Sequence, residues 1–213
     1  MQSFQRINSY IRSLTADDPG ELGAIYRDAI AAEVPVIRPE AREFMRTQLL
    51  MKQPEKILEI GTAVGYSSLF MLSVVASAQV TTMELDEKRI KKAKENINRM
   101  GKQDKINILE GDAYELLKTL PDEYYDFIFV DAAKAQYINY LPDVKRVAKH
   151  SAVIITDNVL QEGDVLESHF LVEKRNRTIH DRMREYLYAI THDGELVTSV
   201  LSVGDGMAVS VKK

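Results

Sequence analysis

The feature that most restricts the fold of this chain is an alternation of short apolar segments with helix-forming stretches between residues 56 and 159. Five apolar segments have the length and composition of buried parallel strands: KILEI, QVTTMELD, INILEGD, DFIFVDA and SAVIITDNV. The four stretches between them place apolar residues at spacings of three and four, which favours helices. This alternation predicts a doubly wound, mostly parallel α/β sheet.

The segments that flank this alternation have a different pattern. Before it, the spacing of apolar residues predicts helices over residues 4–14, 21–34 and 39–52. After it, residues 163–188 are predicted to form a helix, and LVTSVLSV and MAVSVKK, joined by Gly-Asp-Gly, an antiparallel hairpin. Because no linker or repeat interrupts the chain, we expect one domain over residues 1–213. Its parts would be a helical segment (1–54), a core (55–159) and a closing segment with the hairpin (160–213).

Composition excludes several classes of protein. Hydrophobic residues make up 45% of the 213 residues and charged residues 28%, which is ordinary for a soluble domain. The sequence has no apolar run long enough for a membrane helix, and its N-terminus lacks the apolar centre of a secretory leader. The absence of cysteine excludes disulfides and thiolate metal sites. We therefore expect a cytoplasmic protein that does not associate with membranes.

A glycine-containing loop follows the first predicted strand. Gly61 and Gly65 in EIGTAVGYS would let the backbone turn tightly and approach a ligand. The three-glycine dinucleotide fingerprint is missing. A carboxylate at Glu59 would suit the ammonium of an amino-acid-like cofactor better than a pyrophosphate.

The next two strand ends complete a predicted nucleoside site. Glu84 ends the second strand, at about the 20-residue separation from the loop at which an acid reaches ribose hydroxyls. The third strand ends in Asp112 and Ala113, where they could meet an adenine edge. Each residue alone could be an ordinary strand-end turn residue. The set together favours a nucleoside ligand.

Carboxylates at the fourth and fifth strand ends indicate a metal site. If these strands are neighbours, Asp131 and Asp157 converge, because adjacent strands lie about 4.8 Å apart. Two carboxylates with the amide oxygen of Asn158 form a hard-oxygen set that suits Mg²⁺ or another hard divalent cation. Lys134 follows closely enough to return its amine to this site as a general base. The alternative is a pair of unrelated acids and a surface lysine. The histidines show no metal-ligand spacing and are expected to be structural or solvent-facing: His150, His169, His180 and His192.

These motifs carry a family resemblance. The E-x-G-x-x-x-G-Y-S loop, the M-E-L-D strand end and E-G-D-A resemble class I S-adenosylmethionine-dependent O-methyltransferases of the cation-dependent catechol and caffeoyl-CoA type, which have a Rossmann-like fold. The resemblance implies S-adenosylmethionine and Mg²⁺ as cofactors, and Lys134 with Asp131 as catalytic residues. It implies metal binding by Asp131, Asp157 and Asn158. It implies cofactor contacts from Ile37, Glu59, Gly61, Ser67, Glu84, Asp112, Ala113 and Asp131. Related enzymes form homodimers, so a homodimer is expected.

The substrate is predicted from a basic segment near the C-terminus. Residues 174–184 concentrate four arginines against one acid: Arg175, Arg177, Arg182 and Arg184. Guanidinium groups suit phosphate, although a solvated helix face with salt bridges is the alternative. The Arg-Asn-Arg-Thr-Ile-His stretch resembles bacterial enzymes that methylate 5-hydroxyuridine at the tRNA wobble position to give 5-methoxyuridine. The anticodon loop of tRNA is therefore the predicted substrate. The alternatives are a small catechol or caffeoyl-CoA type acceptor, and a non-catalytic nucleoside-binding module.

Overall fold

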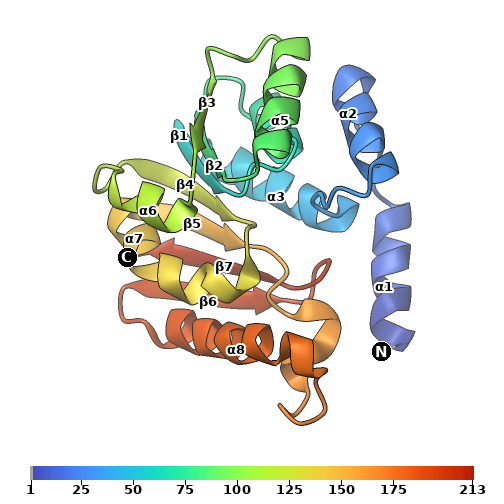
Figure 1. Cartoon of the computed structure of the whole chain (residues 1–213), viewed down its shortest axis with the longest axis vertical. Coiled ribbons are helices and arrows are strands. Elements are labelled where there is room, and N and C mark those ends of the chain that lie inside the picture. Colours follow the sequence, from blue (N-terminus) through green and yellow to red (C-terminus); the bar gives the residue numbers. More distant parts are fainter. Residues whose placement is uncertain (1) are drawn as a thin grey trace.

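The protein, seen here as a computed structural model that describes residues 2–213 and the side chains from residue 6 onward, has one central sheet with helices on both faces (Figure 1). The strands are β1 (Lys56–Ile60), β2 (Gln79–Glu84), β3 (Ile106–Glu110), β4 (Tyr125–Val130), β5 (Ala148–Thr156), β6 (Leu196–Leu201) and β7 (Met207–Lys212). The α-helices are α1 (Gln2–Ser13), α2 (Gly20–Ala31), α3 (Pro39–Lys52), α4 (Tyr66–Val74), α5 (Glu87–Arg99), α6 (Ala113–Lys118), α7 (Tyr137–Val147) and α8 (Arg177–His192). Short 3₁₀ helices are η1 (Lys134–Gln136), η2 (Gln161–Leu166) and η3 (Lys174–Asn176).

The sheet has the predicted doubly wound topology. Its strand order is β3-β2-β1-β4-β5-β7-β6, with β1 to β5 parallel and β7 antiparallel to both β5 and β6. The strand order reverses between β1 and β4. In open α/β sheets, ligands bind outside the carboxyl ends of the strands at such a switch point. The topology therefore places any ligand where β1 and β4 end.

Two apolar cores lie on opposite faces of the sheet. Successive side chains of a strand point to opposite faces, and Ile57 and Phe127 join one core while their neighbours Leu58 and Ile128 join the other. The first core includes buried side chains of α2, α3 and α4, and the second those of α7 and α8. Because apolar side chains cover both faces, β1 and β4 are held rigidly where they end.

The prediction of a single helix over residues 163–188 is wrong for the first half of that range. The structure has η2 there, then an irregular loop and η3, and α8 begins only at Arg177. Gln161, Glu162 and Gly163 adopt φ values of 50°, 53° and 101°. Left-handed backbone of this kind cannot continue a right-handed helix. The apolar residues of this segment do not form one buried face, because Val165 and Val172 are buried while Leu166, Phe170 and Leu171 are exposed.

The N-terminal helices pack beside the first core through a buried ion pair. Arg42 on α3 donates through Nη1 to Asp18 at 2.8 Å, and both side chains are 2% exposed. The hydroxyl of Tyr66, the first residue of α4, also bonds Asp18. The guanidinium of Arg42 therefore fixes α3 against the loop that precedes α2 and against the first residue of α4. Along the described chain, no helix combines the length and apolar content needed to cross a membrane.

Candidate functional site

A large cleft opens at the switch point between β1 and β4. It has a volume of about 1940 Å³ and is bordered by the residues that follow β1, β2, β3, β4 and β5. Gly61 shows why the sequence needs a glycine here. Its φ is +105°, and a Cβ on it would lie 2.0 Å from the backbone oxygen of Asp131. The absence of a side chain therefore lets the ends of β1 and β4 come together on the cleft wall.

Backbone hydrogen bonds orient the acid that ends β2. The Oε2 atom of Glu84 accepts from the amide of Ala63 at 2.9 Å, and Oε1 accepts from the amides of Leu85 and Asp86 at 3.0 Å. A carboxylate has about four acceptor positions, so these three bonds fill both positions on Oε1 and leave one free on Oε2. Glu84 can therefore face the cleft with a fixed orientation and accept from a ligand hydroxyl through Oε2.

Glu59 does not itself border the cleft, although Gly61, two residues later, does. It is fully buried, and its Oε2 accepts from Thr82 at 2.6 Å and from Ser68. Its Oε1 has no hydrogen-bond partner among the residues that the structure describes. Burial raises the pKa of Glu59 to about 7, although the hydroxyls of Ser67 and Ser68 oppose this rise. A buried acceptor without a donor fits the predicted role next to a cofactor ammonium group.

The second half of the cleft holds a cluster of acids with one amine. β4 and β5 are paired neighbours, as predicted, so Asp131 and Asp157 leave adjacent strand ends. Burial raises the pKa of both carboxyl groups, and the charge of Asp131 raises that of Asp157 further. Lys134, on η1, opposes both shifts and lies 3.8 Å from Asp205. Asn158 has a left-handed φ of 57°, and its backbone N–H donates to Asp157 Oδ1 at 2.7 Å.

This cluster fits a hard divalent cation. Asp131, Asp157 and Asn158 all border the cleft, and all three supply oxygen donors. Two close carboxyl groups that burial disfavours as anions gain from a cation placed between them. Oxygen donors without nitrogen or sulfur suit Mg²⁺, Mn²⁺ or Ca²⁺. The chemistry of the donor set therefore agrees with the predicted metal role.

The structure gathers most of the predicted residues around this one cleft. Those on its wall are Ile37, Gly61, Ser67, Glu84, Asp112, Ala113, Asp131, Lys134, Asp157 and Asn158. Their individual contacts with a cofactor or a metal stay predictions. Asp205 also borders the cleft. Sequence analysis assigned it only to the hairpin turn.

The four arginines predicted to bind substrate are not part of the cleft wall. Arg182 donates to the carbonyl of Ala135 at 2.9 Å, and Arg184 to that of Val165 at 3.3 Å. Arg177 donates to the carbonyl of Val172 at 3.2 Å, while the 81% exposed side chain of Arg175 pairs through Nε with Glu173 at 2.8 Å. Three of these guanidinium groups therefore tie loops to α8, a role that the sequence did not reveal.

Two of the histidines make a contact that the sequence did not predict. The side chains of His169, His180 and Asp181 come together, although the spacing of the histidines gave no indication of this. His169 lies in the loop before η3, and the other two lie in α8. His180 is buried and the side chain of His169 is 40% exposed, which agrees with the expectation of structural or solvent-facing histidines, but the sequence did not predict that the two meet.

Comparison with known proteins decides the family. The family model for O-methyltransferases matches residues 22–213. The chain belongs to this family. A catechol O-methyltransferase of Mycobacterium tuberculosis is 31% identical over 207 residues, which cover 93% of this chain and 91% of the relative. A Staphylococcus aureus structure, provisionally described as a caffeoyl-CoA O-methyltransferase, is 29% identical, covers both chains fully and has a TM-score of 0.87. The fold is also that of the Podospora anserina methyltransferase PaMTH1, which was solved with bound SAH. The two chains are 23% identical with a TM-score of 0.86, and the match covers 100% of this chain and 96% of that one.

Proposed function

We propose that this O-methyltransferase transfers a methyl group from S-adenosylmethionine to one of two adjacent oxygens on its substrate, with a divalent cation held at the same cleft. One observation carries the proposal. The nucleoside-binding candidates of β1 to β3 and the oxygen donors at the ends of β4 and β5 border one continuous cleft. The SAH-bound relative with the same fold supports the methyl donor.

The residues of this chain have distinct parts in the proposed reaction. Asp131, Asp157 and Asn158 would hold the cation, which on binding would supply Lewis acidity that lowers the pKa of a substrate hydroxyl. Lys134, in the neutral form that a nearby divalent cation would favour, would take the hydroxyl proton on its Nζ. Asp205, 3.8 Å from that nitrogen, would pair with the ammonium group so formed.

The substrate oxygen would then form a bond to the methyl carbon as the bond from carbon to sulfur breaks. S-adenosylhomocysteine would leave with the electron pair of that bond. Holding both reactants in one cleft replaces a bimolecular encounter, which lowers the barrier without further chemistry by the protein.

The acceptor that the named relatives favour is a catechol-type small molecule. A catechol has two adjacent oxygens, and relatives named as catechol and caffeoyl-CoA O-methyltransferases align with most of this chain. A cation held by three protein ligands has coordination positions left for such an oxygen pair.

The tRNA acceptor has the same chemistry in a larger molecule. The 5-hydroxyl and O4 of 5-hydroxyuridine are also adjacent oxygens, and a wobble base in a single-stranded loop can be splayed into a pocket. The cleft of about 1940 Å³ would hold the methyl donor as well as the acceptor, so its volume does not distinguish a catechol from a splayed base. Arg175, which is exposed and pairs with Glu173, would exchange that partner for a phosphate outside the cleft.

One assay separates the two acceptors. Labelled S-adenosylmethionine and Mg²⁺ are incubated with either tRNA bearing 5-hydroxyuridine or a panel of catechols and caffeoyl-CoA. Transfer to tRNA that weakens steeply with salt, and less steeply in Arg175→Ala, supports the tRNA acceptor. Transfer to the catechol panel alone rules it out. Transfer to neither, in the presence of Mg²⁺ or Mn²⁺, contradicts the proposed reaction.

A further inference from the structure

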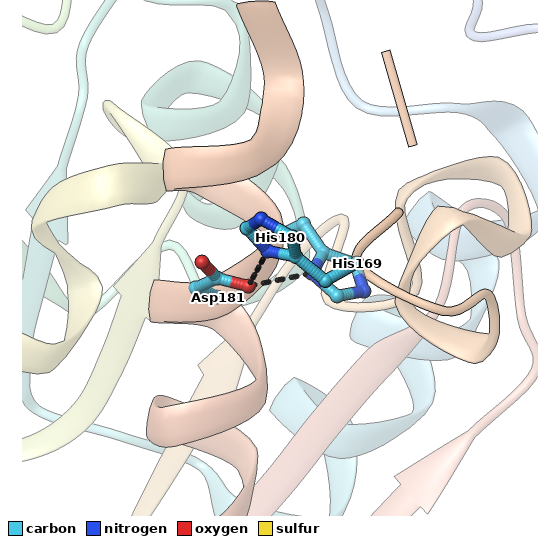
Figure 2. Close-up of side chains that lie close together, drawn as sticks. All are labelled: His169, His180 and Asp181. Carbon is cyan, nitrogen blue, oxygen red and sulfur yellow. Dashed lines mark hydrogen bonds and ion pairs between the residues drawn. The ribbon is translucent and has the colours of Figure 1, made fainter. Parts of the chain in front are cut away.

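A second group of metal-binding side chains lies outside the cleft, between the loop that follows η2 and the first turns of α8. Figure 2 shows His169, His180 and Asp181 side by side. The Nδ1 atom of His169 lies 2.8 Å from Asp181 Oδ1, and the Nδ1 atom of His180 lies 3.0 Å from the same oxygen. One ligand atom from each of the three residues falls within 4.8 Å of the other two.

The hydrogen bonds of His180 indicate that a cation belongs in this group. The ring is buried, at 1% exposure, and its Nε2 lies 3.1 Å from the backbone oxygen of Glu167. A carbonyl oxygen only accepts, so Nε2 carries the hydrogen. In a neutral imidazole the lone pair is then on Nδ1. This lone pair faces the Oδ1 atom of Asp181, which is also an acceptor. Two acceptors 3.0 Å apart need a proton or a metal ion between them.

A second imidazole favours a metal ion over a proton as the bridging cation. The Nδ1 atom of His169 points at the same Asp181 oxygen from the opposite segment (Figure 2). Two imidazole nitrogens and one carboxylate oxygen are the donors that Zn²⁺ and neighbouring first-row metals prefer. In a tetrahedral zinc site with bonds of about 2.0–2.1 Å, ligand atoms lie about 3.3 Å apart. Small side-chain rotations from 2.8 and 3.0 Å would reach that separation.

The surroundings support His180 as a ligand. Metal-bound histidines usually donate their other ring N–H to a backbone carbonyl or a carboxylate, as His180 does to Glu167. The side chain of Asp181 is 52% exposed, so water can complete the coordination. Two cations lie near this loop: Arg177 donates to the carbonyls of Phe170 and Val172, and Arg184 to that of Val165. Their charges oppose the binding of a metal ion, so we expect a moderate affinity.

We propose that His169, His180 and Asp181 form a second metal site, selective for Zn²⁺ or a similar imidazole-binding metal. The site is separate from the oxygen donors of the cleft and does not depend on the proposed methyl transfer. It joins the loop after η2 to α8; α8 borders the cleft through Ile179, and η2, which precedes the loop, borders it through Asp164. A metal ion there would fix one wall of the cleft.

The test measures metal binding directly, not activity. The Asp157→Ala protein is freed of metal with EDTA, so that the oxygen donors of the cleft do not contribute, and is titrated with Co²⁺ and Zn²⁺. We expect one ion per chain, visible ligand-field bands of tetrahedral Co²⁺, and displacement of Co²⁺ by Zn²⁺. Adding His169→Ala should weaken binding at least tenfold. Adding His192→Ala, at the exposed end of α8, should not change it.

Thermal unfolding is a second readout for the same proteins. Zn²⁺ should raise the Tm of the parent and of the His192→Ala variant, and should leave that of His169→Ala unchanged, because a ligand that binds only the folded state stabilises it. Less than one ion per chain at saturating Zn²⁺, or equal affinity with and without His169, overturns the proposal. In that case protons alone bridge the cluster.

Discussion

Replacing Glu59 with glutamine tests the electrostatics of the cofactor side of the cleft. Burial raises the pKa of this carboxyl group from the ordinary 4.5 to about 7. In the unfolded chain Glu59 loses its proton near 4.5, while the folded protein keeps it up to about 7. The free energy of unfolding therefore falls as the pH rises between these values. At about 1.4 kcal/mol per pKa unit, the loss is about 3 kcal/mol above pH 7.

Glu59→Gln removes the charge and leaves a neutral side chain of the same shape. We expect the variant to gain about 3 kcal/mol relative to the wild type between pH 4.5 and pH 7.5, measured by urea unfolding at each pH. Glu55→Gln, at an exposed position just before β1, is the matched control and should show no such gain. Parallel pH profiles for the wild type and Glu59→Gln would refute the reasoning.

The same carboxyl group should couple cofactor binding to proton release. An ammonium group near Oε1 would favour the ionised form of Glu59, so S-adenosylhomocysteine should bind at pH 6 with release of up to about one proton. Calorimetry in buffers of different ionisation enthalpy measures that proton. Glu59→Gln should bind the ligand more weakly and release none. Proton release that is equal in both proteins would exclude Glu59 from the cofactor site.

Three further substitutions test other parts of the structure. Asp157→Ala should lower the rate of methyl transfer by about 1000-fold, because it removes a metal ligand worth several kcal/mol of transition-state stabilisation. Calorimetry should show that S-adenosylhomocysteine binding is largely kept. Full turnover with EDTA present would contradict the metal role. Gly61→Ala should destabilise the fold by about 3 kcal/mol or more in urea unfolding, because the added Cβ would lie 2.0 Å from a backbone oxygen. The control Gly194→Ala, with open space around it, should cost less than about 1 kcal/mol. Arg42→Ala should cost about 3–5 kcal/mol, because it removes the buried partner of Asp18 at 2.8 Å and leaves this carboxylate only the longer contact with Arg46 at 3.4 Å. Arg46→Ala, with a 34% exposed side chain, should cost about 1 kcal/mol or less in the same assay, and equal losses would show that the buried pair has no special weight.

Much of the sheet and of the cleft could be predicted from the sequence because both depend on local patterns. The apolar period identifies β1 to β5, and a parallel sheet brings their carboxyl ends to one edge. Asp131 and Asp157 therefore come together once β4 and β5 are neighbours, which the structure confirms. The small residue needed at Gly61 is also visible in the sequence, because a loop after a strand that approaches another backbone favours glycine.

The residues that sequence analysis missed depend on contacts between distant segments. Asp205 reaches Lys134 because β7 returns antiparallel to β5, and nothing near the Gly-Asp-Gly turn indicates that partner. His169 and His180 meet because left-handed residues near Gly163 break the expected helix and turn the loop back toward α8. The guanidinium of Arg184 bonds a loop carbonyl whose position depends on the same break. A period of three or four residues cannot show such an interruption.

The central claim is that Asp131, Asp157 and Asn158 hold one divalent ion beside the bound methyl donor. Crystals grown with Mn²⁺ and S-adenosylhomocysteine test it most directly, because Mn²⁺ takes the same oxygen ligands as Mg²⁺ and scatters anomalously. The account predicts one anomalous peak within about 2.0–2.4 Å of an oxygen from each of the three residues, next to the sulfur of the bound product. Bound product with no peak between the ends of β4 and β5 would contradict it.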